Sequence, residues 1–247
     1  MDRLIYTSLT AMRAAQSRQT VTANNLANVS TPGFRGDLAE AQALWLRGGE
    51  AESRAMASEE VLAADMRSGV VTSTGREMDI ALDGDALLGV QAENGEEGYT
   101  RRGDLMLSET GLLTTGDGRP VLGSQGPLIL PPADKIMIGP DGRISIIPTG
   151  GDPAQPQEVD RLKLVSFDRD NVVRGIDGLF RGKGGSVLPD DPDARVSSGH
   201  IEASNVSATT TLVEMIEAQR SWDTQLKLIT SARDMDSASA DLMRMPN

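Results

Sequence analysis

The stretch that decides the fold is Leu212-Val-Glu-Met-Ile-Glu-Ala-Gln-Arg-Ser-Trp-Asp-Thr-Gln-Leu-Lys-Leu-Ile229, near the C-terminal end of a chain of 247 residues. Its large side chains follow one another at alternating spacings of three and four residues, which is the a/d spacing of a coiled coil. These seam positions are Leu212, Met215, Gln219, Trp222, Leu226 and Ile229. The pattern predicts a helix from about Ser204 to Met243, with Ser204 or Asn205 as its N-cap.

The N-terminal end has a weaker form of the same pattern. Residues 2–28 contain no Gly or Pro, and the positions at spacings of four and three are Ile5, Leu9, Met12, Gln16, Gln19, Ala23 and Leu26. Five of these seven are apolar, so the stretch is typical of an amphipathic helix with a narrow seam. We expect the helix to end at Ser30-Thr-Pro-Gly33, because Pro disfavours a helical predecessor and Gly permits a positive φ.

The middle of the chain has a different pattern. From about Gly69 to Gly199, short runs rich in aliphatic residues alternate with turns, as in 78–82, 105–107, 128–130 and 143–147. The dipeptides between these runs are typical of tight turns. They are Asp83-Gly84, Asn94-Gly95, Asp117-Gly118 and Asp141-Gly142. We therefore predict one antiparallel, twisted β body.

The predicted fold class is α+β, with a discontinuous, coiled-coil-like helical module formed by both ends of the chain. The predicted parts are an N-terminal helix (1–34), a connecting segment (35–68), a β domain (69–200) and a C-terminal helix (201–247). Residues 35–67 are rich in Ala, Glu and Arg, and their pattern leaves helical, extended and disordered conformations open.

The narrow seams suggest that the helices need partners. Their apolar side chains do not offset the conformational entropy lost when the two ends become ordered. Our hypothesis is that both termini are labile in the free subunit and become ordered on assembly. An ordinary two-helix hairpin packed on the β domain remains the alternative.

The charge and hydropathy of the chain exclude several classes of protein. A formal net charge of −12 disfavours binding to nucleic acid or to an anionic membrane surface. No run of 18 apolar residues is present, so we expect no membrane insertion. Residues 2–13 are too short and hydroxyl-rich for a cleavable secretory signal. The absence of Cys leaves the compartment open.

No enzymatic site emerges, and we expect no catalytic residues, cofactor or metal. His200 is the only histidine. Neither a Ser-His-Asp triad nor a multi-histidine metal site is therefore indicated. Asp190-Asp-Pro-Asp193 lacks EF-hand spacing and indicates an acidic turn. Gly182-Lys-Gly-Gly185 lacks the pattern of a phosphate-binding loop and indicates a connection.

Three motifs carry a resemblance to a known family. Ala23-Asn-Asn-Leu-Ala-Asn-Val-Ser-Thr-Pro-Gly-Phe34 resembles the N-terminal signature of flagellar rod and hook proteins, and Glu202-Ala-Ser-Asn-Val206 with the following helix resembles their C-terminal signature. The central motifs resemble the β domain of the rod proteins. They are Tyr99-Thr-Arg-Arg-Gly-Asp104, Gly111-Leu-Leu-Thr-Thr115, Val121-Leu-Gly123 and Gly126-Pro127.

The chain length and the opening Met1-Asp-Arg-Leu-Ile-Tyr-Thr7 look most like the proximal-rod branch of this family. Leu87-Leu88 departs from it, because many relatives have paired Phe there. A distal-rod or hook paralogue is the alternative within the family. From another class, the alternative is a β-rich binding module with a helical dimerisation stalk.

The resemblance implies a structural subunit of the bacterial flagellar basal body, located in the periplasm. It implies delivery through the flagellar type III export apparatus without a cleaved signal peptide. Its partners would be other rod subunits, adjacent axial proteins and the export apparatus, with no nucleic acid. The implied assembly interface comprises Ile5, Leu9, Met12, Asn24, Asn25, Leu26 and Asn28 with the six seam residues of the C-terminal helix.

Individual interface residues have two possible roles each. The asparagines at 24, 25 and 28 can cap the helix end or bond to neighbouring subunits. Gln219 can fix the register of the seam or simply stay partly hydrated. Trp222 can anchor a contact between subunits or pack on the N-terminal helix of its own chain.

Overall fold

The computed structural model describes residues 2–45, 55–167, 171–175 and 177–243. The chain forms two compact units, both built from separate segments. The helical unit comprises residues 1–29, 36–65 and 206–247, and the β-rich unit comprises 30–35 and 66–205. Two helices and many antiparallel strands confirm the predicted α+β class.

The helical unit contains both terminal helices. They are α1 (Asp2–Ala27) and α2 (Ala208–Met243). The second helix begins later than we predicted, because Ser207 caps it: the Ser207 Oγ accepts the backbone N–H of Thr210 at 3.5 Å. Asn205, one of the two predicted caps, instead donates its side-chain amide to the carbonyl oxygen of Arg67 in the β-rich unit.

The connecting segment forms a β-hairpin. Strands β1 (Asp37–Trp45) and β2 (Ala55–Ala64) pair antiparallel from Asp37 opposite Ala64 to Trp45 opposite Ala55. Of the three conformations that the sequence left open, the described part of this segment is therefore extended.

The strands of the β-rich unit are mostly short, as its closely spaced turns require. In chain order they are β3 (Val71–Ser73), β4 (Ile80–Leu82), β5 (Ala86–Gln91), β6 (Glu97–Thr100), β7 (Leu105–Leu107), β8 (Leu113–Thr115), β9 (Leu122–Gly123), β10 (Gly126–Pro127), β11 (Ala133–Ile138), β12 (Arg143–Pro148), β13 (Gln157–Arg161), β14 (Leu164–Ser166), β15 (Val172–Arg174), β16 (Phe180–Gly182), β17 (Val196–Ser198) and β18 (His200–Glu202). One 3₁₀ turn, η1 (Lys183–Gly185), follows β16.

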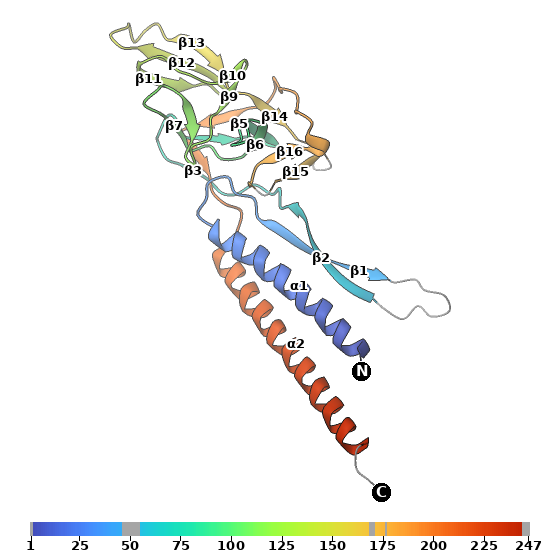
Figure 1. Ribbon diagram of the computed structural model, residues 1–247. Helices are drawn as coiled ribbons and strands as arrows, with labels where there is room; N and C mark the ends of the chain where they lie inside the picture. Colours follow the sequence, from blue (N-terminus) through green and yellow to red (C-terminus); the bar gives the residue numbers. More distant parts are fainter. Residues whose placement is uncertain (1, 46–54, 168–170, 176, 244–247) are drawn as a thin grey trace. The chain divides into compact units, whose positions relative to one another are not determined.

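These strands pair across long distances in sequence. The largest sheet has the order β14-β5-β6-β16-β15, and β11-β12-β13 form a second sheet (Figure 1). Near the chain ends of the unit, β17 pairs with β4 and β18 pairs with β3, both antiparallel. The C-terminal strands thus complete sheets that the first strands begin.

The glycines of all four predicted turn dipeptides have positive φ, as tight turns require. Residues 128–130 form no named strand, contrary to our prediction, and Ile129 makes only an isolated bridge to Leu112. The flanking Pro127 and Pro131 lack the N–H groups that a longer ladder would use.

A buried ion cluster in the β-rich unit joins residues near the beginning and the end of that unit to Arg101 in its middle. The Glu202 carboxylate, whose side chain is 1% exposed, lies 2.8 Å from the Arg35 guanidinium and 2.5 Å from that of Arg101. It also accepts the backbone N–H of Gly69 at 2.8 Å. Arg101 additionally donates to the carbonyl oxygens of Leu82, Gly84 and Ala86.

The segment that follows α1, up to Phe34, packs beside this ion cluster. Gly33 donates its N–H to the Glu202 carbonyl oxygen at 2.8 Å. Its φ is +65°, and a Cβ there would lie 2.2 Å from the Arg101 carbonyl oxygen, so only Gly fits. Phe34 is buried, with the Arg174 guanidinium 4.5 Å above its ring centroid.

We expect Glu202→Gln to destabilise the β-rich unit by about 3–5 kcal/mol, because it removes the negative charge that two buried guanidinium groups contact. Urea unfolding followed by circular dichroism measures the loss.

Glu158→Gln is the matched control. It removes the same charge from an exposed pair with Arg143, whose side chains are 55% and 56% exposed, and should cost less than about 1 kcal/mol. Equal effects of the two substitutions would show that the buried cluster contributes no more than a surface pair.

Candidate assembly interface

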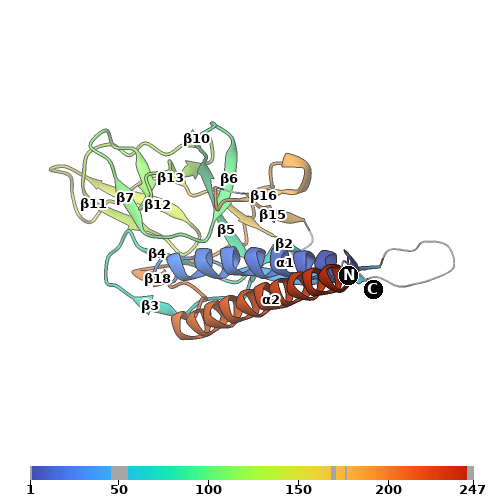
Figure 2. The same cartoon turned by 60° about the horizontal axis from the view of Figure 1, so that its bottom comes forward.

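The two terminal helices lie side by side and antiparallel within the helical unit (Figures 1 and 2). The β1–β2 hairpin also contacts α1. Helix α2 has 36 residues against 26 in α1, and its last turns extend past the start of α1 (Figure 1). Part of α2 therefore has no helical partner within the described chain.

One stripe of α2 is shielded from solvent. Its buried or half-buried residues follow one another at alternating spacings of four and three. All the remaining described side chains from 207 to 238 are exposed. The stripe comprises Thr211, Met215, Ala218, Trp222, Gln225, Ile229 and Ala232. Because α1 is the element in contact with α2, this stripe is the seam of the helix pair.

The seam is rotated relative to the predicted one. Met215, Trp222 and Ile229 belong to both, but the other three predicted positions, Leu212, Gln219 and Leu226, are exposed. Thr211, Ala218 and Gln225, each one position earlier, replace them in the seam, and Ala232 extends it. The small side chains at 211, 218 and 232 let helices approach closely.

Small residues are also buried on α1, which contacts α2 and both strands of the hairpin. Ser8, Ala15 and Thr22 are buried at a spacing of seven residues, and Val21 is buried beside them. Among the predicted positions, Leu9 is 40% exposed, whereas Met12 and Leu26 are half-buried. Ile5 lies in α1, but its side chain is outside the described part. A repeat of Ser, Ala and Thr at heptad spacing could have revealed this face from the sequence.

Large apolar side chains remain exposed on α2 outside its seam. They are Leu212, Val213, Ile216, Leu226, Leu228 and Met235, between 41% and 52% exposed. At 100° per residue, Leu226 and Leu228 point about 160° apart. The helix thus presents apolar surface on more than one side, which is typical of a helix that is buried on several sides.

The predicted asparagine cluster makes bonds within its own unit. Asn28 donates its side-chain amide to the Asn24 carbonyl oxygen at 2.9 Å, next to the last turn of α1. Asn25 and Asp37 exchange two bonds, of 2.9 and 2.7 Å, and Asn24 donates to the Asp37 carboxylate at 2.8 Å. These asparagines therefore cap the helix and fix the first residue of β1.

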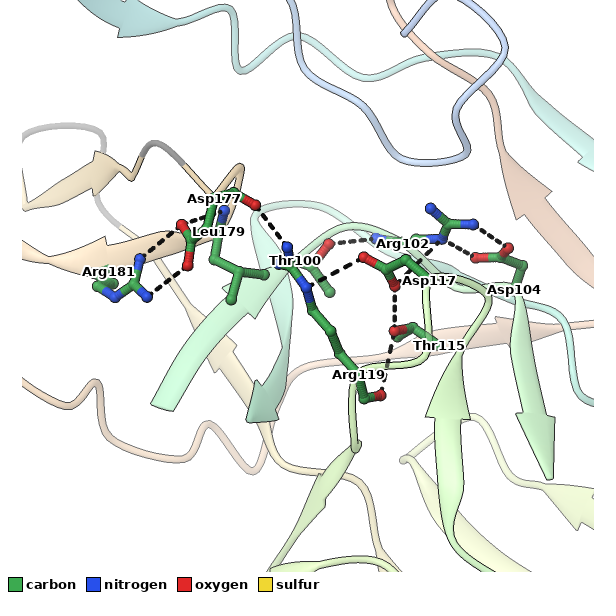
Figure 3. A network of polar contacts seen from close by, with 9 residues as sticks. All are labelled: Thr100, Arg102, Asp104, Thr115, Asp117, Arg119, Asp177, Leu179 and Arg181. Carbon is green, nitrogen blue, oxygen red and sulfur yellow. Dashed lines mark hydrogen bonds and ion pairs between the residues drawn. The ribbon is translucent and has the colours of Figure 1, made fainter. Parts of the chain in front are cut away.

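In the β-rich unit, the two arginines of the motif at residues 99–104 have different partners. Arg101 enters the buried ion cluster, whereas Arg102 makes a bidentate pair with Asp104 at 2.6 and 2.8 Å (Figure 3). These bonds to Asp104 raise the pKa of Arg102. Asp117 joins Arg102 to Arg119, at 3.8 and 3.3 Å respectively.

The network continues to the strand pair β15–β16. Arg119 donates to the Asp177 carbonyl oxygen at 2.7 Å, and the Asp177 carboxylate binds Arg181 at 2.7 and 2.9 Å (Figure 3). The Arg181 guanidinium holds the pKa of Asp177 below its ordinary value. Cations and anions alternate through the network, so these charges are balanced among themselves.

The histidine and the acidic turn that the sequence analysis weighed as chemical groups make hydrogen bonds within the chain. The His200 Nδ1 lies 2.9 Å from the Ser198 carbonyl oxygen. The Asp191 carboxylate accepts the Ser166 hydroxyl and the Asp193 N–H. Within the described ranges, no group of three His, Cys, Asp or Glu side chains could hold a metal ion. Nor does any described helix combine the length and hydropathy needed to cross a membrane.

Three family models match the chain in the order of its motifs. Residues 5–35 match the flagella basal body rod protein model, and residues 81–146 match the D1 domain of the flagellar hook protein FlgE/F/G family. Residues 197–242 match the C-terminal model of the flagellar basal body rod FlgEFG proteins. The matched ends include most of α1 and most of α2.

Whole-length relatives agree with these models. The chain is 39% identical over 251 residues to the flagellar basal-body rod protein FlgF of Salmonella typhimurium, and 40% identical over 252 residues to FlgF of Escherichia coli. Each alignment covers 99% of this chain and 100% of the relative. FlgG of Bacillus subtilis is 30% identical over 268 residues, with the same coverage. The resemblance found in the sequence is thereby confirmed, and the chain belongs to the family of flagellar basal-body rod proteins.

Proposed function

We propose that this chain is a structural subunit of the flagellar basal-body rod, in its proximal part, and that it catalyses no reaction. The observation that carries the proposal concerns the pair of terminal helices. One stripe of α2 is shielded from solvent, and apolar side chains on its other sides are exposed. The identity of 39–40% over the full length to the FlgF proteins of Salmonella typhimurium and Escherichia coli supports the proximal assignment.

Assembly would use both helices. The seam residues Met215, Trp222 and Ile229 hold α2 to α1, while Leu212, Gln219 and Leu226, with Leu9 on α1, face neighbouring subunits. Contacts that repeat in one direction between different surfaces give an open helical filament, since nothing closes the ring. Dense packing of such subunits would transmit torque.

The proposal includes a location and partners. The subunit would lie in the periplasmic part of the basal body, beside other rod subunits and adjacent axial proteins. It would reach this place through the flagellar type III export apparatus without a cleaved signal peptide. The segments 1–34 and 201–247 would then serve as the assembly module, and 69–200 as the outer β domain.

The alternatives differ in the surfaces that they require. A dimerisation stalk needs one additional apolar face, whereas α2 exposes apolar residues in directions about 160° apart. This favours several neighbours over a single symmetric one. A distal-rod or hook role uses the same surfaces, and labelled basal bodies would separate it by the position of the subunit along the axis.

We expect Leu226→Asp to abolish motility, because a charge placed on an exposed apolar contact cannot be desolvated in the assembled rod. Soft-agar swimming and counts of hooks by electron microscopy measure the effect. Trp222→Asp should do the same by a different route, since it disrupts the seam between α1 and α2.

Leu226→Met is the matched control, because it keeps an apolar side chain at the same position and should leave swimming intact. The urea midpoint of the β-rich unit should be unchanged in all three variants. A motile Leu226→Asp strain would contradict this role of α2.

We further expect the backbone amides of residues 5–26 and 206–240 to exchange rapidly in the isolated subunit, because the seam is narrow and lined by small side chains. Hydrogen exchange followed by mass spectrometry measures this, with the buried strand β5 as the protected internal reference. Helices as protected as β5 would show that they are already stable before assembly.

A further inference from the structure

One short segment near the C-terminal end of the β-rich unit holds the beginning of that unit in place. It contains strands β17 and β18, which are separated by Gly199. Among the described strands, β17 pairs only with β4, and β18 pairs only with β3. We call residues 194–205 the strap. In the part of the chain that the structure describes, the strap is therefore the only partner strand of β3 and β4.

The strap is also attached outside these strand pairs. The Ala203 N–H donates to the Val70 carbonyl oxygen at 2.9 Å, and the Val196 N–H donates to the Pro140 carbonyl oxygen at 2.9 Å. The side chain of Val196 is buried in the core of the unit, as is that of Ala194. The strap thus packs on the core while it pairs with the first strands.

The segment that follows α1 is held by the strap as well. Gly33 donates its N–H to the Glu202 carbonyl oxygen at 2.8 Å. The Asn205 N–H donates to the Phe34 carbonyl oxygen at 3.2 Å. The Glu202 carboxylate contacts the buried Arg35 guanidinium at 2.8 Å. Burying Arg35 before this carboxylate arrives carries a large desolvation cost, so the segment takes its buried place only together with the strap.

The middle of the β-rich unit, in contrast, has sheets of its own. The sheets β14-β5-β6-β16-β15 and β11-β12-β13 consist entirely of strands between residues 86 and 182 (Figure 1). The strap and its partner strands are farther apart in sequence than any two strands paired within these sheets. Closing a longer loop costs more entropy, so the sheets of the middle form before the strap pairs.

We propose that the strap closes last when the β-rich unit folds. Its closure docks β3, β4 and the segment after α1 in one step. Closure also holds Phe34 beside Asn205, a few residues beyond the end of α1 and a few before the start of α2. Because these two points are then fixed, the loop that the helix pair must close is short, and the narrow seam between the helices forms at a lower entropic cost.

The strap makes the assembly module depend on a nearly complete chain. This consequence rests on the proposed function, in which an export apparatus delivers the chain. Arg35 and Glu202 lie near opposite ends of the chain. Most of the chain must therefore have passed the apparatus before the strap closes, whichever end leads. A chain that has passed only in part cannot hold both helices together.

Pulsed hydrogen exchange of the purified full chain during refolding from urea tests this order. The amides of β5 should become protected first, and those of β4 and β18 should follow together in a later phase. Two matched substitutions of buried valines separate the steps, at Val196 in the strap and at Val121 in the middle, which are 2% and 0% exposed. Val121→Ala should slow the protection of β5 about threefold or more, whereas Val196→Ala should leave it unchanged within about twofold.

Two results would overturn the inference. One is simultaneous protection of β18 and β5, which would show that the unit folds in a single step. The other is equal slowing of β5 by Val196→Ala and Val121→Ala. Neither result bears on the rod role, because the isolated subunit is measured. Absence of the chain from purified basal bodies would instead overturn the rod role and the consequence for export, and the order of folding would stand.

Discussion

The carboxylate of Glu202 is the constraint on which the β-rich unit depends. It contacts the guanidinium groups of Arg35 and Arg101 and the backbone N–H of Gly69. The chain passes between the two compact units near residues 29, 35, 65 and 205, so Arg35, Gly69 and Glu202 each lie within a few residues of one of these passages. A single buried negative charge therefore fixes the segments through which both terminal helices are attached in sequence.

We infer that this cluster contributes more to the specificity of the fold than to its stability. Burying three charged groups carries a large desolvation cost, which close contacts and further hydrogen bonds must offset. Arg101 has these further bonds, to the carbonyl oxygens of the last residue of β4, the first residue of β5 and Gly84 in the turn between them. An incorrect pairing of β3 with β18 would leave Glu202 away from its partners. The cost of that error fixes the register of the short strands, which have few hydrogen bonds of their own.

The sequence was most informative where periodicity or turn chemistry is local. The bounds of α1, the turn glycines and the family motifs could all be predicted from neighbouring residues. The seam of the helix pair is harder to predict, because the a/d pattern places large side chains at the buried positions. In the structure, Ala218 and Thr211 are buried and Leu212 and Leu226 are exposed, since α1 packs closely on small residues. Nor could the buried ion cluster be predicted, because residues 35, 101 and 202 are brought together only by the fold.

The exposed leucines of α2 lie outside the seam, so packing against α1 does not explain why they are apolar. In an isolated helix pair, an apolar residue outside the contact gains nothing from folding, and exposed apolar surface lowers solubility. Leu212 and Leu226 on one side of the seam, and Leu228 and Met235 on the other, are explained if α2 is surrounded in its working state. A helix at the centre of a helical assembly has neighbours on every side. The proposed assembly accounts for these exposed side chains, whereas an isolated pair of helices does not.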